Sequence, residues 1–181
     1  MQTFYELAEQ RQSDRTYETR PVEKEILERM LEAARLSPSA CNGQPWKIIV
    51  VDDCELKNRI ADATSTKVIG MNHFTKQAPV CLVVVEESAN ISSRIGSLVK
   101  RKYFPSIDLG ILASHITLAA ADEGLGSCII GWFDEKKVKS LLDIPLSRKI
   151  PFLILLGYTT APHRDKIRKP LSDIVSYNGY K

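Results

Sequence analysis

Helix-type and strand-type hydrophobic patterns alternate along this chain, and that alternation limits the folds open to it more than any other feature. Apolar residues recur at helical spacing over 4–8, 26–34, 55–63, 108–123 and 135–142. Short apolar runs typical of buried strands lie between them, at 47–52, 80–85, 127–131 and 150–156. Because each helix stripe and sheet face must be covered, we expect helices packed on one central sheet, with strand directions left open.

Prolines and composition set the outer limits of this domain. Pro21 stands where the second helix can begin, and Pro38 follows its end. Beyond Gly157 the sequence becomes basic and is interrupted by proline, which predicts an irregular tail. A chain of 181 residues is long enough to bury a core without disulfides or metal, so we expect a single domain over 1–181.

Charge and hydropathy bear on the partners and the location of the protein. The net charge is only +3, from 25 Lys plus Arg against 22 Asp plus Glu, so composition favours neither nucleic acid nor an anionic membrane as a partner. The longest apolar run, 107–121, is shorter than the roughly 20 residues that span a bilayer and is typical of a buried helix. The first residues lack the pattern of a secretory signal, so we expect a cytoplasmic protein.

Common catalytic motifs do not occur. Four widely spaced cysteines (Cys41, Cys54, Cys81 and Cys128) form no CxxC pair and have no histidine cluster nearby, so we expect free thiols and no metal site. The sequence also lacks GxGxxG, Walker, GxSxG and HExxH patterns. Hydrolase and metalloenzyme functions therefore have little support.

One loop, PSACNGQPW over 38–46, has an unusual composition. Its small residues allow the backbone to approach a planar ligand closely, and the amides of Asn42 and Gln44 suit the polar edge of a ring system. On the residues alone, the same loop also fits a rigid connection between a helix and a strand, with Trp46 in the core.

Two basic clusters stand at opposite ends of the chain. The first contains Arg11, Ser13 and Arg15, and the second contains Lys166 and Arg168. If folding brings them together they form a phosphate site, because guanidinium groups match phosphate oxygens in pairs and Ser13 adds a neutral donor. Taken singly, each cluster is more typical of a solvated surface.

Taken together, these segments resemble the nitroreductase family of FMN-dependent oxidoreductases over nearly the whole chain. The resemblance has four landmarks in the family's order. They are RQSDR at 11–15 followed by Tyr17 and by RP at 20–21, PSACNGQPW at 38–46, DLG at 108–110 leading through GLGSC at 124–128 to IIG at 129–131, and GY at 157–158 followed by KIRKPL at 166–171.

This resemblance implies a fold, a cofactor and a reaction. The implied fold is an α+β sandwich, with a mostly antiparallel central sheet flanked by helices, in a homodimer that holds FMN at the subunit interface. The implied reaction has NAD(P)H deliver a hydride to flavin N5 and leave, after which a nitro-aromatic compound, a quinone or a similar small acceptor takes its place. No catalytic side chain is identifiable, because the flavin performs this ping-pong chemistry.

The resemblance also implies the cofactor contacts. The expected phosphate and ribityl contacts are Arg11, Gln12, Ser13, Arg15, Lys166 and Arg168, although Gln12 stands where the family commonly has a basic residue or histidine. The expected ring contacts from the partner subunit are Pro38, Ser39, Ala40, Asn42 and Gln44. The backbone of Ile129, Ile130 and Gly131 is expected near flavin N5, and Asn72 is a more loosely matched ring contact.

Several alternatives remain open at this point. A specialised flavin enzyme of the same fold (a dehalogenase, a dehydrogenase or a flavin-degrading enzyme), a non-catalytic FMN-binding protein, and a basic interaction protein without cofactor all fit the same residues. Cys128 lies near the expected flavin face, where a buried packing role is more typical than a catalytic one. The short segment between Glu86 and Pro105 predicts an open active site. The physiological substrate, the choice of NADH or NADPH and the reactivity with oxygen do not follow from the sequence.

Overall fold

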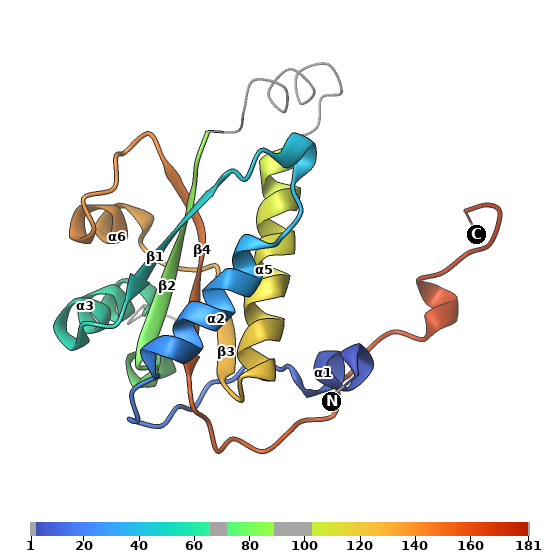
Figure 1. Ribbon diagram of the computed structural model, residues 1–181, viewed down its shortest axis with the longest axis horizontal. Coiled ribbons are helices and arrows are strands. Elements are labelled where there is room, and N and C mark those ends of the chain that lie inside the picture. The colour runs from blue at the N-terminus through green and yellow to red at the C-terminus, as the bar shows by residue number, and fades with distance from the viewer. Residues whose placement is uncertain (1–2, 66–71, 89–102, 181) are drawn as a thin grey trace.

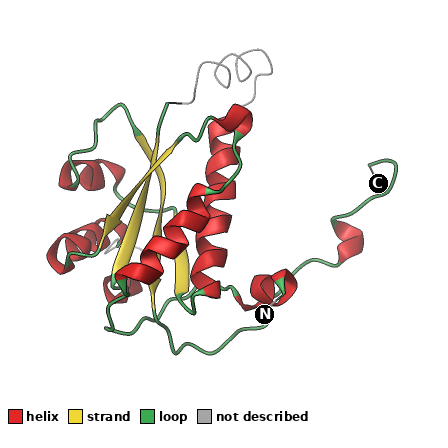
Figure 2. Cartoon of the chain, in the orientation of Figure 1, coloured by secondary structure: helices red, strands yellow, loops and turns green. Residues whose placement is uncertain are grey.

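The computed structural model describes residues 3–65, 72–88 and 103–180 (Figure 1). Its helices are α1 (Phe4–Gln10), α2 (Lys24–Arg35), α3 (Cys54–Thr64), α5 (Phe104–Asp122) and α6 (Glu135–Leu141), with 3-10 turns η1 (Ala40–Asn42), η2 (His73–Gln77) and η3 (Leu171–Asp173). Its strands are β1 (Trp46–Val51), β2 (Val80–Glu86), β3 (Gly126–Ile130) and β4 (Lys149–Gly157). Every helix and strand that the hydrophobic pattern predicts is present (Figure 2).

The four strands form one sheet in the order β1-β2-β4-β3, and each neighbouring pair is antiparallel. The predicted α+β class with a mostly antiparallel sheet is therefore confirmed. The two central strands, β2 and β4, read as continuous apolar runs because the sheet is covered on both faces. In this sheet β1 and β3 are the edge strands.

Helices cover both faces of the sheet (Figure 1). Helices α2 and α5 pack on one face, where Met30 and Ile116 contact the side of β2 that carries Leu82. Helices α3 and α6 pack on the other face, where Ile60 and Val138 share a core with alternate strand residues. This two-sided burial holds the ends of the strands, and with them the candidate site, in fixed positions.

Helix α5 is the central helix of this core. The helix has 19 residues and a mean hydropathy of 1.3, so by length and composition alone it could cross a membrane. Half of the segment, however, is buried inside the protein. Leu109 and Leu112 pack with α2, as expected for a core helix. The helix begins at Phe104, before the predicted 108, because Pro105 is well tolerated in a first helical turn.

The start of α2 corrects one prediction. The helix begins at Lys24, with Glu23 as its N-cap residue, and not at Pro21. The Glu23 carboxylate accepts hydrogen bonds from Tyr158 Oη and Arg20 Nη2, both at 2.6 Å. These contacts hold the residues before Lys24 in extended backbone, so the helix cannot start at the proline.

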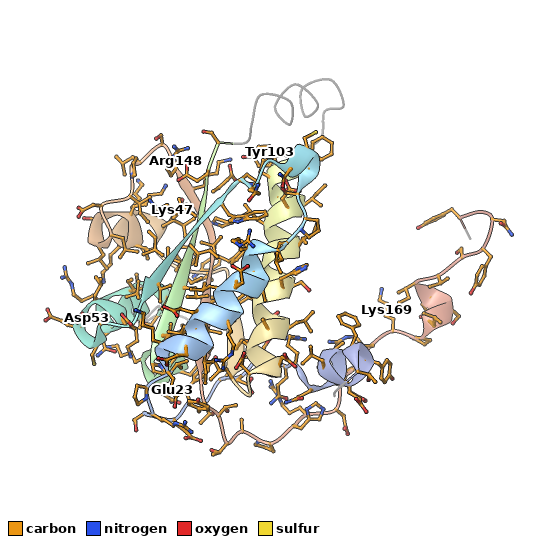
Figure 3. All side chains as sticks on the ribbon, viewed as in Figure 1. Glu23, Lys47, Asp53, Tyr103, Arg148 and Lys169 are labelled. Carbon is orange, nitrogen blue, oxygen red and sulfur yellow. The ribbon has the colours of Figure 1, made fainter. Side chains whose placement is uncertain are left out.

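The chain beyond Gly157 is irregular, as predicted, apart from the short turn η3. It leaves the sheet, passes α1 and runs away from the body of the protein (Figure 1). Figure 3 shows Tyr103 at the start of α5 and Lys169 well outside the packed core. Most of the segment expected to leave the active site open, 89–102, lies outside the described residues.

Candidate functional site

Folding brings the two basic clusters together. Ser13 forms a parallel β-bridge with Ser127 at the start of β3, which fixes the N-terminal segment against the sheet edge. The tail then joins this segment: the Arg164 backbone N–H donates to Gln12 Oε1 at 3.1 Å, and Lys166 Nζ donates to the Arg11 carbonyl oxygen. Residues about 150 positions apart in the sequence therefore form one local structure.

A pocket of about 350 Å³, here called the cation pocket, lies between these two segments. Its lining residues are Arg11, Gln12, Ser13, Arg164, Asp165, Lys166, Ile167 and Arg168. None of its four cations forms an ion pair with a described carboxylate. Partial burial and the neighbouring Arg11 and Arg168 charges lower the pKa of Lys166, whereas Glu9 opposes this effect. The four cations outnumber Asp165, the carboxylate among the lining residues, so the pocket favours an anion.

Arg15 does not line the cation pocket. It is exposed, and its charge opposes the effect of burial on the pKa of Cys128, so Arg15 lies near this residue of β3. Burial nevertheless raises the pKa of the Cys128 thiol, and only 4% of the residue is exposed. Cys128 is thus a protonated, packed side chain in the core.

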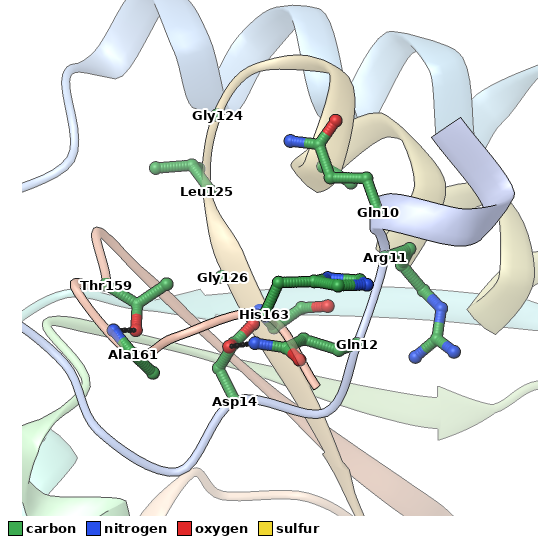
Figure 4. Close-up of a pocket in the computed structure, with 12 residues that line it drawn as sticks. Gln10, Arg11, Gln12, Asp14, Gly124, Leu125, Gly126, Thr159, Ala161 and His163 are labelled. Carbon is green, nitrogen blue, oxygen red and sulfur yellow. Dashed lines mark hydrogen bonds between the residues drawn. The ribbon is translucent and has the colours of Figure 1, made fainter. Parts of the chain in front are cut away.

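A second, smaller pocket of about 230 Å³ surrounds Asp14 (Figure 4). The buried Asp14 carboxylate accepts hydrogen bonds from Gln12 Nε2 at 2.8 Å and from the Ser127 backbone N–H at 3.3 Å. A Cβ atom on Gly126 would lie 2.9 Å from Asp14 Oδ2 and 2.7 Å from Thr159 Cγ2, so this position requires glycine. Gln12 therefore links Asp14 to the tail as well as lining the cation pocket.

The residues expected near flavin N5, Ile129 to Gly131, form a strip at the far end of β3, on the sheet edge. Ile129 is 45% exposed, Ile130 is buried and Gly131 is exposed. Asn72 lies beside this strip, because its Nδ2 donates to the Trp132 carbonyl at 3.3 Å and to the Thr64 carbonyl at 3.2 Å. Trp132 itself is 58% exposed, and the sequence reasoning missed it although it directly follows the IIG landmark.

The loop that contains η1 has an unusual backbone. Cys41, Asn42 and Gln44 have φ values of 51°, 51° and 44°, in the left-handed region that residues other than glycine rarely adopt. Within the loop, Ser39 Oγ accepts from the Gln44 backbone N–H at 3.0 Å, and Gln44 Nε2 donates to Asn42 Oδ1 at 3.2 Å. Backbone of this kind concentrates at ligand-binding sites.

The loop is anchored by Asp108, a residue that the sequence reasoning placed in a landmark but not in the site. Asp108 Oδ1 accepts from the Ala40 backbone N–H at 3.0 Å, and the residue is only 3% exposed. Its other carboxylate oxygen has no hydrogen-bond partner among the described residues. The sequence signal that could have identified Asp108 is its carboxylate inside an apolar run.

The loop and the cation pocket do not meet within one chain. The loop packs at the start of α5, whereas the cation pocket lies beside α1, near the end of α5 (Figure 1). Asp108, which contacts the loop, and Asp122, at the end of α5, are separated by about 21 Å at the usual rise of a helix. Within the described residues, no group of His, Cys, Asp and Glu is placed to bind a metal.

Comparison with known proteins identifies the family. The model of the nitroreductase family matches residues 8–70 and 67–158, which together cover most of the chain. The chain belongs to the nitroreductase family. This nitroreductase-family protein is therefore an enzyme, a flavin oxidoreductase, as the sequence resemblance implies. Its basic tail lies beyond the matched residues.

Individual relatives extend this result. The chain is 30% identical to an oxygen-insensitive NADPH nitroreductase of Helicobacter pylori, over 83% of this chain and 84% of that protein. It superimposes on the structure of an FMN-dependent nitroreductase from Clostridium difficile with a TM-score of 0.73 and 28% identity, covering 96% of this chain and 98% of the other. It is also 27% identical to an iodotyrosine deiodinase of Thermotoga neapolitana, over 99% of this chain and 100% of that protein.

Proposed function

We propose that this enzyme binds FMN and uses NAD(P)H to reduce small oxidised acceptors of the nitro-aromatic and quinone class. The observation that carries the proposal is the cation pocket, in which Arg11, Arg164, Lys166 and Arg168 have no paired carboxylate among the described residues. A phosphomonoester supplies the missing negative charge and accepts several charge-assisted hydrogen bonds at once.

The residues present fit such a phosphate. Arg168 uses Nη1 to donate to the Ile167 carbonyl at 2.8 Å, which leaves the other guanidinium N–H groups as donors. Ser13 contributes a hydroxyl from the opposite wall of the pocket. Strand β3 leads from there to Gly131, and an edge strand offers unpaired backbone N–H and C=O groups to a neighbouring ring.

When bound, FMN supplies two-electron chemistry, taking a hydride from NAD(P)H and passing it to an acceptor. In this proposal the protein side chains bind and orient but do not act as acids or bases. We assign Arg15 to the ribityl chain or ring, because it does not line the cation pocket but its charge acts on Cys128 of β3. Donor and acceptor use one opening in turn, which gives ping-pong kinetics.

We further propose that two copies of the chain complete each site. The loop with Asn42 lies at the opposite end of α5 from the cation pocket, so a two-fold partner is needed to bring both groups to one flavin. The C-terminal tail supports such a dimer. Its apolar residues Ile167, Leu171 and Tyr177 are 92%, 69% and 80% exposed, and a partner surface would bury them.

A spectrum of the purified protein tests the cofactor proposal first. We expect flavin absorption, FMN as the heat-released compound, and a light-scattering mass of two chains. The holoenzyme is then expected to oxidise NADH or NADPH with menadione or nitrofurazone as acceptor. A colourless protein that does not bind added FMN would overturn the proposal, and tight FMN binding without turnover would indicate a storage or sensing role.

Reductive dehalogenation is the second candidate, because the similarity to an iodotyrosine deiodinase extends over 99% of this chain. The two functions differ in their acceptor. Release of iodide from iodotyrosine under NADH or NADPH, with negligible reduction of menadione, would favour the deiodinase function. Steady reduction of menadione without release of iodide would favour the nitroreductase function.

A further inference from the structure

Two lysines are buried among the described residues, and their surroundings differ. Lys139 on α6 is 8% exposed, and its Nζ lies 2.7 Å from Glu135 Oε1, so its charge is paired. Lys57 on α3 is 6% exposed, and its Nζ donates to the Lys76 carbonyl oxygen at 2.6 Å. Among the described residues no carboxylate lies within 4.0 Å of Lys57 Nζ.

The titratable groups around Lys57 do not pair with it. The thiols of Cys54 and Cys81 and the ammonium of Lys76, which is itself paired with Asp62 at 2.6 Å, affect its pKa most. Asp52 lines the same pocket but forms no ion pair with Lys57. Burial lowers the pKa of Lys57, and the Lys76 charge acts in the same direction. Because an unpaired buried charge is costly, a bound anion would stabilise the protonated side chain.

Lys57 lines a pocket of about 460 Å³, here called the Lys57 pocket, which is within the size range of small-molecule sites. Pro21, Val22, Pro79 and Val80 give it an apolar wall. It lies where β1 ends and β2 begins, and it shares no lining residue with the cation pocket. No contact assigned to the flavin involves it.

Polar groups around Lys57 favour a singly charged ligand. Gln77 Oε1 accepts from the Tyr17 backbone N–H at 3.2 Å, which leaves the amide NH₂ of Gln77 as a donor in the pocket wall. Asp52 also lines the pocket, and its charge would repel a dianion more strongly than a monoanion. With one unpaired cation and one apolar wall, the pocket suits a carboxylate on a hydrocarbon body better than a phosphate.

We propose that the Lys57 pocket binds a small organic carboxylate, whose carboxylate pairs with Lys57 and whose hydrocarbon body lies against Pro21, Val22, Pro79 and Val80. The ligand carboxylate pairs with Lys57 as the Glu135 carboxylate pairs with Lys139. This site is separate from the proposed flavin site, so it does not depend on which acceptor the enzyme reduces.

Isothermal titration of the purified holoenzyme with butyrate tests the proposal, with inorganic phosphate as the comparison anion. We expect one butyrate bound per chain, weaker phosphate binding, and an unchanged flavin spectrum. Lys57→Met is expected to weaken butyrate binding at least about tenfold, the loss that follows from removing one charge-assisted contact. Lys136→Met, which removes an exposed lysine on α6, is the matched control and should bind butyrate like the parent protein.

Each other outcome overturns the proposal. Equal butyrate affinity in Lys57→Met and the parent protein would remove Lys57 from the site, and phosphate binding as tight as butyrate binding would remove the carboxylate assignment. Butyrate binding that changes the flavin spectrum and is unaffected by Lys57→Met would place butyrate in the flavin site. Thermal unfolding shows whether Lys57→Met is folded, and Lys57→Gln provides a second neutral variant if it is not.

Discussion

The Asp108 carboxylate, inside the apolar helix α5, accepts a hydrogen bond from the Ala40 backbone N–H at 3.0 Å. The bond joins the start of the core helix to a loop whose Cys41 and Asn42 have left-handed backbone. The second Asp108 oxygen is buried without a partner among the described residues, and burying such a group is costly. We infer that the shape of the loop depends on this anchor.

Removing the anchor should destabilise the protein. Asp108→Ala leaves the Ala40 N–H without its partner, and we expect the free energy of unfolding to fall by about 1–3 kcal/mol. Asp108→Asn keeps an acceptor oxygen for the Ala40 N–H and should therefore retain most of the stability of the parent protein. Urea unfolding followed by circular dichroism measures both variants. An alanine variant as stable as the parent protein would show that Asp108 does not anchor the loop.

Arg168→Ala tests the cation pocket. The substitution removes one charge-assisted contact to phosphate, so FMN binding should weaken by roughly 1.5–3 kcal/mol. A titration that follows quenching of flavin fluorescence measures the affinity. Arg59→Ala removes an exposed arginine from α3, outside the cation pocket, and should leave the FMN affinity unchanged. Equal FMN affinity in the two variants would exclude Arg168 from the phosphate site.

The elements of this fold were predictable because their signals are local. Hydrophobic spacing placed every α-helix and strand of the described residues, and the ends differ by a few residues where a cap decides them, as Glu23 does for α2. Strand direction is not a local property. The antiparallel sheet followed only from the family resemblance, because β2 and β4 have the same continuous apolar pattern that parallel strands have.

The candidate site was only partly predictable, because several of its residues act through distant partners. Arg164 Nη2 donates to the Ser13 carbonyl at 2.5 Å across 151 positions, which no periodicity indicates. Asp14 and Trp132 were missed for the same reason. The sequence also could not show that the loop with Asn42 and the cation pocket lie at opposite ends of α5, since that separation depends on how the helix packs.

Acid stability should depend on Glu23. The hydrogen bond from Tyr158, and then that from Arg20, lower the pKa of Glu23 to about 2 from its ordinary value of 4.5. A lowered carboxylate pKa contributes stability above 4.5 and loses it as the pH falls toward 2. The difference in unfolding free energy between the parent protein and Glu23→Gln should therefore shrink over that interval. A difference that stays constant with pH would contradict this assignment, and Glu28→Gln on the same helix is the control.

We predict that Trp132 contacts a planar acceptor in the proposed flavin site. It is 58% exposed and follows Gly131, and Asn72 holds its backbone through the carbonyl oxygen. An aromatic pair contributes about 0.5–1.5 kcal/mol, so Trp132→Ala should raise KM for menadione by about 2-fold to 10-fold, while Trp132→Phe stays close to the parent value. Steady-state kinetics with ferricyanide as a non-aromatic acceptor gives the comparison. An equal rise in KM for both acceptors would show that stacking is not the cause.

Deleting residues 171–181 should separate the two subunits of the proposed dimer. The deleted segment contains Leu171, Ile174 and Tyr177, which are 69%, 65% and 80% exposed, while the cations that line the cation pocket are all retained. If the tail packs on a partner, light scattering will detect a monomer, and FMN binding will weaken because the partner's loop no longer reaches the flavin. Deleting only 178–181 should leave the dimer intact. A full deletion that stays dimeric and binds FMN normally would show that other surfaces hold the subunits together.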